Sequence, residues 1–246
     1  MSEIYRTKAL VLKNRNFGEA DRIVVLLTED YGKIEAVVKG ARRQRSRFVG
    51  NTLAFNLVQT MLFPGKNLAT LSQAELIHPF SGLREDLIRM AYASYWADLV
   101  DRFVPLHETA REIFRFMLAA FVTLEGDYPS DLVNLAFQIR LLNYLGYQPE
   151  LSQCVSCGEQ EQTLQFSAAA GGLVCRDCHE NYRDLIEIQP EVVAKIQELA
   201  ATDMRQLTQL GIGPGQCKLI GQVLRSFIEA RIDQPLKSQL FLDTLL

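Results

Sequence analysis

The chain has 246 residues, of which 48% are hydrophobic and 22% charged, with 15 glycines and 8 prolines. This profile is typical of a folded globular protein with room for one large or two ordinary domains, and it excludes the disordered and fibrous classes. No apolar run approaches the roughly 20 residues that a membrane-spanning helix needs.

The net charge of -3 is unevenly distributed along the chain. Residues 1–80 carry 12 Lys and Arg against 7 Asp and Glu, or +5, whereas residues 81–246 carry 14 against 22, or -8. A basic segment beside an acidic remainder indicates a polyanionic partner that meets one part of the protein, although an ordinary solvated basic surface has the same composition. The first residues lack the basic start and apolar stretch of a secretory signal, so we expect a reducing cytoplasmic location and no disulfides.

The first eighty residues predict five β-strands. Apolar runs and alternation place strands over residues 8–15, 22–28 and 33–39, with turn signals at 17–20, 29–32 and 64–67. Five short strands favour a small OB-type barrel over a sandwich, which usually has about seven strands. Two further strand faces are marked by Phe55, Leu57, Met61 and Phe63, and by Ala69, Leu71 and Ile77.

A helical period follows the strands. Apolar residues recur every three or four positions over 88–103, 113–124 and 132–142, and again over 192–199 and 220–228. The predicted fold is therefore α+β and multidomain, with a cysteine-containing module inserted into a helical domain. Its expected parts are a barrel over 1–80, a helical domain over 81–150 and 183–246, and the inserted module over 151–182.

The inserted module carries two Cys-x-x-Cys pairs separated by 17 residues. Each pair places two thiolates on one tight turn, and this separation lies within the range of zinc ribbons. Four sulfur ligands close the coordination sphere of Zn²⁺, so such a site organises the chain rather than hydrolysing a substrate. A thiol redox pair is the alternative. The predicted ligands of one structural Zn²⁺ are Cys154, Cys157, Cys175 and Cys178.

A basic segment, Lys39–Arg47, separates two predicted strands, so its side chains should project together into solvent. Arginine makes bidentate contacts to phosphate, and the flanking Phe48 can stack on a base, although a solvated basic loop is the alternative. The predicted nucleic-acid-binding residues are Lys39, Arg42, Arg43, Arg45 and Arg47, extended by Lys33 and Arg15.

Other signals are weaker. The glycines of Leu210–Gly215 are similar to a turn that binds phosphate at a helix start, or form an ordinary interhelical turn. No nucleophile, base or phosphate-loop motif is found, so we expect a protein that is not an enzyme.

Several short motifs, in this order, resemble the RecO family of bacterial DNA repair proteins, which are recombination mediators. They cover nearly the whole chain: Lys39–Arg43, Ser46–Phe48, Leu71–Glu75, Leu145–Pro149, Gly172–Cys175, Leu236–Ser238 and Phe241–Leu242.

The resemblance implies an N-terminal OB domain, a helical domain and a zinc-binding module. It also implies binding of single- and double-stranded DNA, strand annealing, and a role with RecR in loading RecA onto DNA coated by single-strand binding protein. For the acidic tail of that protein we expect an apolar groove rimmed by Arg111, Arg115 and Arg140. Binding of structured RNA is the alternative function, since OB barrels and zinc ribbons occur there too.

Overall fold

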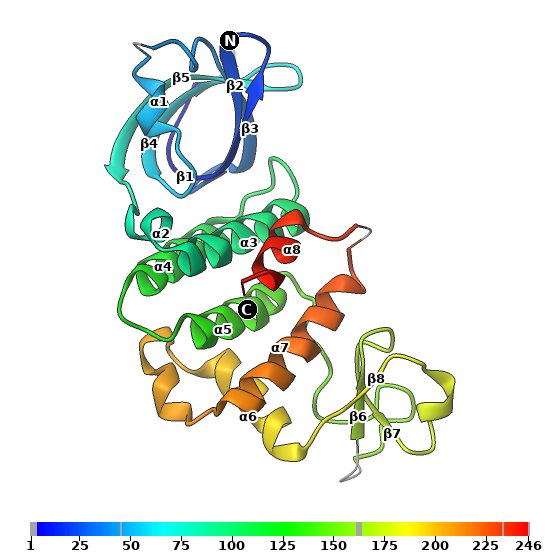
Figure 1. The fold of residues 1–246 in the computed structure, drawn as a ribbon. Helices are drawn as coiled ribbons and strands as arrows, with labels where there is room; N and C mark the ends of the chain where they lie inside the picture. Colours follow the sequence, from blue (N-terminus) through cyan, green and yellow to red (C-terminus); the bar gives the residue numbers. More distant parts are fainter. Residues whose placement is uncertain (1–3, 45, 161–163, 233, 246) are drawn as a thin grey trace. The chain divides into compact units, whose positions relative to one another are not determined.

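The computed structural model describes residues 4–44, 46–160, 164–232 and 234–245 (Figure 1). The chain forms two compact units. One comprises Met1–Gly126 with Ser238–Leu246, and the other comprises Asp127–Lys237. The last residues therefore return to the unit that contains the first.

The first unit contains the predicted five-stranded barrel, which closes in the order β1-β2-β3-β5-β4 (Figure 1). Closure depends on one short parallel pairing between β3 and β5, whereas the other neighbouring strands are antiparallel. A short helix, α1 (Phe48–Asn51), lies in the connection between β3 and β4. The strands are β1 (Tyr5–Phe17), β2 (Asp21–Thr28), β3 (Gly32–Val38), β4 (Leu57–Phe63) and β5 (Ala69–His78).

Alternate residues of the strands fill the barrel. On β2, Val24 and Leu26 belong to the interior cluster, while Val25 between them lies on the other face of the sheet, where it is also buried. Phe55, predicted to lie on a strand, precedes β4 instead. Its φ of 74° interrupts extended backbone, and its N–H donates to the Val11 carbonyl at 2.7 Å.

Three helices lie beside the barrel and carry an aromatic core, and the two longer ones confirm the helical periods predicted over 88–103 and 113–124. They are α2 (Gly82–Glu85), α3 (Leu87–Phe103) and α4 (Arg111–Glu125). The Asp86 side chain begins α3 by accepting from the Arg89 N–H at 2.9 Å. Between α3 and α4, the rings of Trp96 and Phe121 stack with centroids 6.4 Å apart. No helical period predicted α8 (Lys237–Asp243), where the Ser238 hydroxyl donates to the Asp98 carboxylate.

The second unit packs α5 (Ser130–Tyr144), before the cysteines, against α6 (Pro190–Ala201) and α7 (Pro214–Glu229), after them. Of the helices expected in one helical domain, α3 and α4 belong instead to the unit that contains the barrel. The inserted module is a sheet of order β7-β6-β8.

No helix in the described part of the chain is long and apolar enough to cross a bilayer. The remaining elements are β6 (Leu164–Ser167), β7 (Gly172–Cys175), β8 (Leu185–Glu187) and the 3-10 helices η1 (His179–Asn181) and η2 (Met204–Leu210).

The glycines before α7 form an interhelical turn. Gly211 has a φ of 61°, and the Gly213 N–H is already bonded to Oε1 of Gln216 at 3.2 Å. This bond caps α7, so the turn fits the structural alternative.

A charge network ties the barrel to α3. The Lys13 ammonium lies 2.5 Å from an Asp98 oxygen and 2.8 Å from an Asp101 oxygen, and the Lys33 ammonium lies 3.1 Å from the other Asp101 oxygen. The Lys33 side chain is only 8% exposed. Burial by itself would raise the pKa of Asp101, but the hydrogen bonds and charges of Lys13 and Lys33 outweigh burial and lower it.

We expect Asp101→Ala to lower the free energy of unfolding at neutral pH by about 3 kcal/mol, because the buried Lys33 ammonium loses its carboxylate and keeps only the backbone carbonyl of residue 101. Since the pKa of Asp101 is lowered below its ordinary value of 3.8, its contribution is complete above that pH and is lost as the pH falls through the lower folded pKa. Urea unfolding from pH 7 to pH 2 measures both effects.

The matched control is Lys33→Met combined with Asp101→Leu, which removes both charges and should recover most of the lost stability. A single Asp101→Ala variant as stable as the parent at pH 7 would contradict this role for the network.

Candidate nucleic-acid interface and metal centre

The connection between β3 and α1 is fixed by its backbone. The Gly40 N–H donates to the Asp21 carboxylate at 2.7 Å, and the Arg42 N–H donates to the Ala20 carbonyl at 2.8 Å. Between them, Ala41 is fully buried in the barrel core. Gly40 has a φ of 65°, which a side chain would strain. The connection therefore folds inward over the barrel end and back to the β1–β2 turn.

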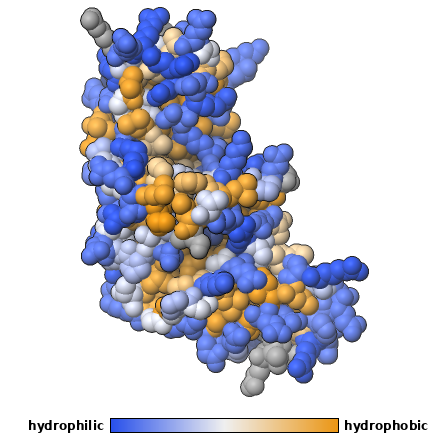
Figure 2. All heavy atoms as spheres, viewed as in Figure 1, coloured by the Kyte–Doolittle hydropathy of each residue, from blue (hydrophilic) through white to orange (hydrophobic). Residues whose placement is uncertain are grey.

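The side chains of this connection point into solvent. Lys39, Arg42, Arg43 and Arg47 are exposed, and within the described residues none has a carboxylate within 4 Å. Arg42 donates to the Gly18 carbonyl at 3.1 Å, and Arg47 donates to the Ser72 carbonyl of β5 at 3.2 Å. The guanidinium charges therefore remain available to an anion. Hydrophilic side chains cover much of the barrel surface in the space-filling view (Figure 2).

The predicted site residues do not all gather here. Arg15 is exposed on β1, two residues before the β1–β2 turn, so it lies near the same barrel end. Arg45 lies outside the described residues. Lys33 is at the other end of β3, opposite Leu27, buried and paired with Asp101. Its ammonium is not available to a phosphate, and we leave it out of the interface.

The aromatic side chains near the loop differ from expectation. Phe48 is half-buried against the barrel core, and the Arg47 guanidinium lies 5.4 Å from its ring centroid, so a base has little access to it. Phe17 is 47% exposed at the end of β1, next to Gly18, whose carbonyl binds Arg42. The sequence pattern predicts a turn at Phe17. The signal that identifies it as a stacking residue is an aromatic side chain at a hairpin tip, next to a basic loop.

The four cysteines of the inserted module converge. Cys154 and Cys157 lie in the turn before β6, Cys175 ends β7, and Cys178 precedes η1. All four sulfur atoms lie within 4.8 Å of one another, and the Cys157 and Cys175 sulfurs are 3.6 Å apart. Thiolates at about 2.3 Å from a tetrahedral Zn²⁺ stand about 3.8 Å apart, so the set fits one such ion.

Backbone N–H groups in this cluster stabilise the thiolate form of Cys154. The Gly158 N–H closes the first turn by donating to the Cys154 carbonyl at 2.8 Å, with Gly158 at a φ of 78°. Burial by itself would raise the pKa of Cys154, but backbone N–H groups of Cys175, Cys157 and Ser156 lower it to about 6. Hydrogen bonds with Cys175 and Cys157 raise the pKa of Cys178 to about 12.

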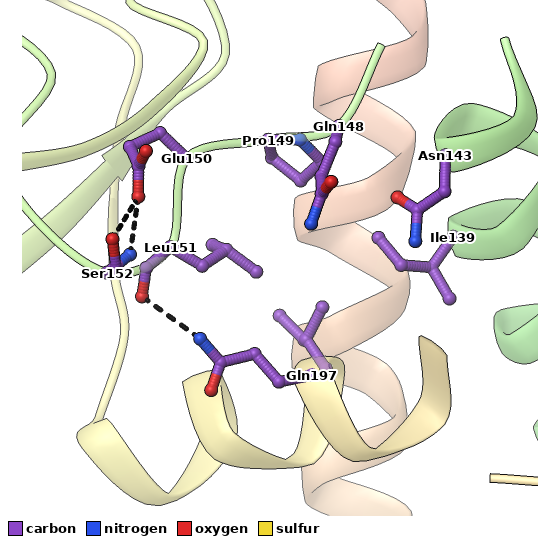
Figure 3. Close-up of a pocket in the computed structure, with 9 residues that line it drawn as sticks. Ile139, Asn143, Gln148, Pro149, Glu150, Leu151, Ser152 and Gln197 are labelled. Carbon is purple, nitrogen blue, oxygen red and sulfur yellow. Dashed lines mark hydrogen bonds between the residues drawn. The ribbon is translucent and has the colours of Figure 1, made fainter. Parts of the chain in front are cut away.

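The second unit also has a pocket of about 350 Å³ between α5, α6 and the segment that leads to the cysteines (Figure 3). Ile139, Pro149, Leu151 and Ile196 give it an apolar side. Its charged lining residue is Glu150, whose carboxylate accepts from the Ser152 N–H and hydroxyl. A pocket with this lining does not favour an acidic peptide.

The three arginines expected to rim an apolar groove are divided between the two units. Arg111 and Arg115 are exposed on α4 in the first unit, and Arg111 is paired with Asp30. Arg140 belongs to α5 in the second unit, where its guanidinium donates to the Leu199 carbonyl at 3.2 Å. Of the three, Arg115 has an exposed apolar neighbour on the same helix face, Val122, which is 51% exposed.

Comparison with known proteins matches the chain along nearly its whole length. The family domain described as "Recombination protein O N terminal" matches residues 1–80, and "Recombination protein O C terminal" matches residues 84–240. The chain is 36% identical to the DNA repair protein RecO of Symbiobacterium thermophilum, over 98% of each chain. It is 38% identical to that of Heliobacterium modesticaldum, over 96% of this chain and 88% of the relative. It is 30% identical to that of Bacillus subtilis, over 98% and 94%.

We expect the purified protein to contain about one zinc per chain and Cys175→Ala to lose it. A structural site of this kind contributes about 10 kcal/mol or more of binding free energy to folding. Amide hydrogen exchange over residues 151–182 should therefore accelerate in the variant, while exchange in the barrel strands stays unchanged. Elemental analysis and exchange mass spectrometry measure these outcomes.

Cys217→Ser is the matched control, since Cys217 lies on α7 outside the cluster and should leave the zinc content unchanged. A metal-free parent protein that forms a reversible disulfide on mild oxidation would instead favour the redox interpretation.

Proposed function

The chain belongs to the RecO family of DNA repair proteins, and on that basis we propose that the basic end of its barrel binds single- and double-stranded DNA and promotes strand annealing. The observation that carries the proposal is the set of exposed cations on the β3–α1 connection, which have no carboxylate partner among the described residues. The proposed DNA contacts are Lys39, Arg42, Arg43, Arg45, Arg47 and Arg15.

Annealing in this proposal makes and breaks no covalent bond, and the protein is not an enzyme. Two complementary strands repel each other through their phosphates, and guanidinium groups that neutralise those phosphates reduce the repulsion. The exposed ring of Phe17 offers a stacking surface for one unpaired base beside the phosphate contacts. The four cysteines of the inserted module would hold Zn²⁺, which would keep residues 151–182 folded and take no chemical part in annealing.

In this proposal the acidic excess of residues 81–246 repels DNA, so that part of the chain stays free to bind proteins. We propose that the protein works in the bacterial cytoplasm, at the nucleoid, with RecR and single-strand binding protein, and that it helps RecA onto DNA. Family membership supports these partners. It also favours DNA over the alternative of structured RNA, and competition at matched salt between a single DNA strand and a folded RNA hairpin separates the two.

We expect the simultaneous replacement of Arg42, Arg43, Arg45 and Arg47 by Ala to flatten the plot of log affinity against log salt. Each neutralised phosphate of a single strand contributes about 0.7 to the slope, so the slope should fall by about 3. Fluorescence anisotropy with labelled oligothymidylate from low to high salt measures it.

Two controls keep the charge effect separate from folding and stacking. Phe17→Ala removes no charge, so it should weaken binding while leaving the slope unchanged. A second variant replaces four exposed cations elsewhere and should leave the slope nearly unchanged: Arg102, Arg183, Arg205 and Lys218. Equal slopes for the parent and the loop variant would remove the loop from the proposed interface.

For the acidic tail of single-strand binding protein we propose the α4 face that carries Arg111, Arg115 and Val122. Arg115→Glu should weaken binding of a tail peptide at least tenfold, because it sets like charges against each other at this face. The measurement is anisotropy with a labelled tail peptide at constant salt. Arg140→Lys, on a half-buried residue of the other unit, is the control, and a loss of binding there with none at Arg115 would move the tail site to α5.

A further inference from the structure

Arg22 stands at the barrel end covered by the β3–α1 connection. Its cross-strand partners are Asn16 on β1 and Val38 on β3. On β2, Val24 and Leu26 face the barrel interior, so Arg22, two residues earlier, continues the same inner face. Val38 on that face is buried in the core. The Arg22 side chain therefore starts at the mouth of the barrel, next to the turn that carries the loop cations.

The guanidinium of Arg22 is incompletely bonded. Its Nε is buried, and it has no hydrogen-bond partner among the residues that the structure describes. Arg42 and Arg47, by contrast, each donate to a backbone carbonyl. Buried donors in folded proteins nearly always have a partner, and an exception calls for an explanation such as a ligand that binds there. Here the unpartnered donor carries a positive charge.

The surroundings fit an anion. In the described chain no carboxylate lies within 4 Å of the Arg22 guanidinium, and the nearby Asp21 oxygen already accepts from the Gly40 N–H. Asn16 is exposed directly across from Arg22, and residues paired in this way project from the same face. Its carboxamide therefore offers a second donor beside the guanidinium. The two terminal nitrogens of an arginine form a planar fork that matches two phosphate oxygens.

We propose that Arg22 and Asn16 form a phosphate site at the barrel mouth that holds one backbone phosphate of a nucleic-acid strand. The proposal rests on the DNA-binding function proposed above and adds a fixed contact to it. The loop cations attract the strand in many arrangements, whereas the fork at Arg22 accepts a phosphate in one orientation. The site thereby sets where the strand lies on the barrel.

Two substitutions separate charge from geometry. Arg22→Met removes both, so we expect the affinity for labelled oligothymidylate to fall at least tenfold and the salt slope to fall by about 0.7. Arg22→Lys keeps the charge without the fork, so the slope should hold while the affinity falls about fivefold. The control is Arg102→Met, at an exposed arginine of α3, which should bind like the parent.

Thermal unfolding is a second measurement. If Arg22 only stabilised the fold, Arg22→Met would lower the melting temperature. Removing a buried unpartnered donor should leave the melting temperature of Arg22→Met unchanged or raise it. Inorganic phosphate should raise the melting temperature of the parent more than that of Arg22→Met.

The proposal fails if Arg22→Met and Arg22→Lys both bind DNA as the parent does, while the loop variant loses binding; the proposed function then stands. It also fails if Arg22→Met melts earlier and Arg22→Lys restores stability with no change in DNA affinity. If the parent itself does not bind oligothymidylate at low salt, the proposed function fails together with this site.

Discussion

The backbone of the β3–α1 connection is the constraint on which the proposed interface depends. Main-chain bonds from Gly40 and Arg42 fasten it to the β1–β2 turn, and buried Ala41 anchors it in the core. The side chains of Arg42 and Arg47 add hydrogen bonds to the Gly18 and Ser72 carbonyls, but these partners are neutral, so the loop is held without neutralising its cations. Carboxylate partners would have fixed the loop as well, but they would have cancelled the charge that a polyanion needs.

The basic residues of the barrel divide into two groups by position along the strands. Lys13 and Lys33 meet Asp98 and Asp101 of α3, where the exposed fraction of the Lys33 side chain is only 8%. The cations of the opposite end lie after β3, beyond the reach of those acids. A buried ion pair stabilises the contact only while both partners are present, so the first group is structural. The second group has no carboxylate partner among the described residues, and it forms the proposed DNA interface.

Sequence patterns predicted the helices and strands more completely than they predicted what each side chain packs against. Period-two and period-3.6 patterns located the five strands and the five long helices, and the cysteine spacing predicted a convergence that the sulfur positions confirm. Alternation placed Lys33 on a strand, but its burial depends on α3, some seventy residues later in the chain, which no local pattern encodes. The same holds for Phe48, which packs inward, and for Phe17, which is left exposed. The short α8 lacks enough turns for a detectable period.

The net charge of the whole chain is a poor guide to what a DNA strand meets at the barrel mouth. Part of the acidic excess of residues 81–246 is already neutralised within the first unit, since Asp98 and Asp101 pair with barrel lysines. At physiological ionic strength charges are screened over about 8 Å, so the loop arginines act mainly with their immediate neighbours. Those neighbours include Arg22 but few acids, of which Asp21 is bonded to backbone. A chain of net charge -3 can therefore present a strongly positive end, and the salt dependence of binding should follow that end alone.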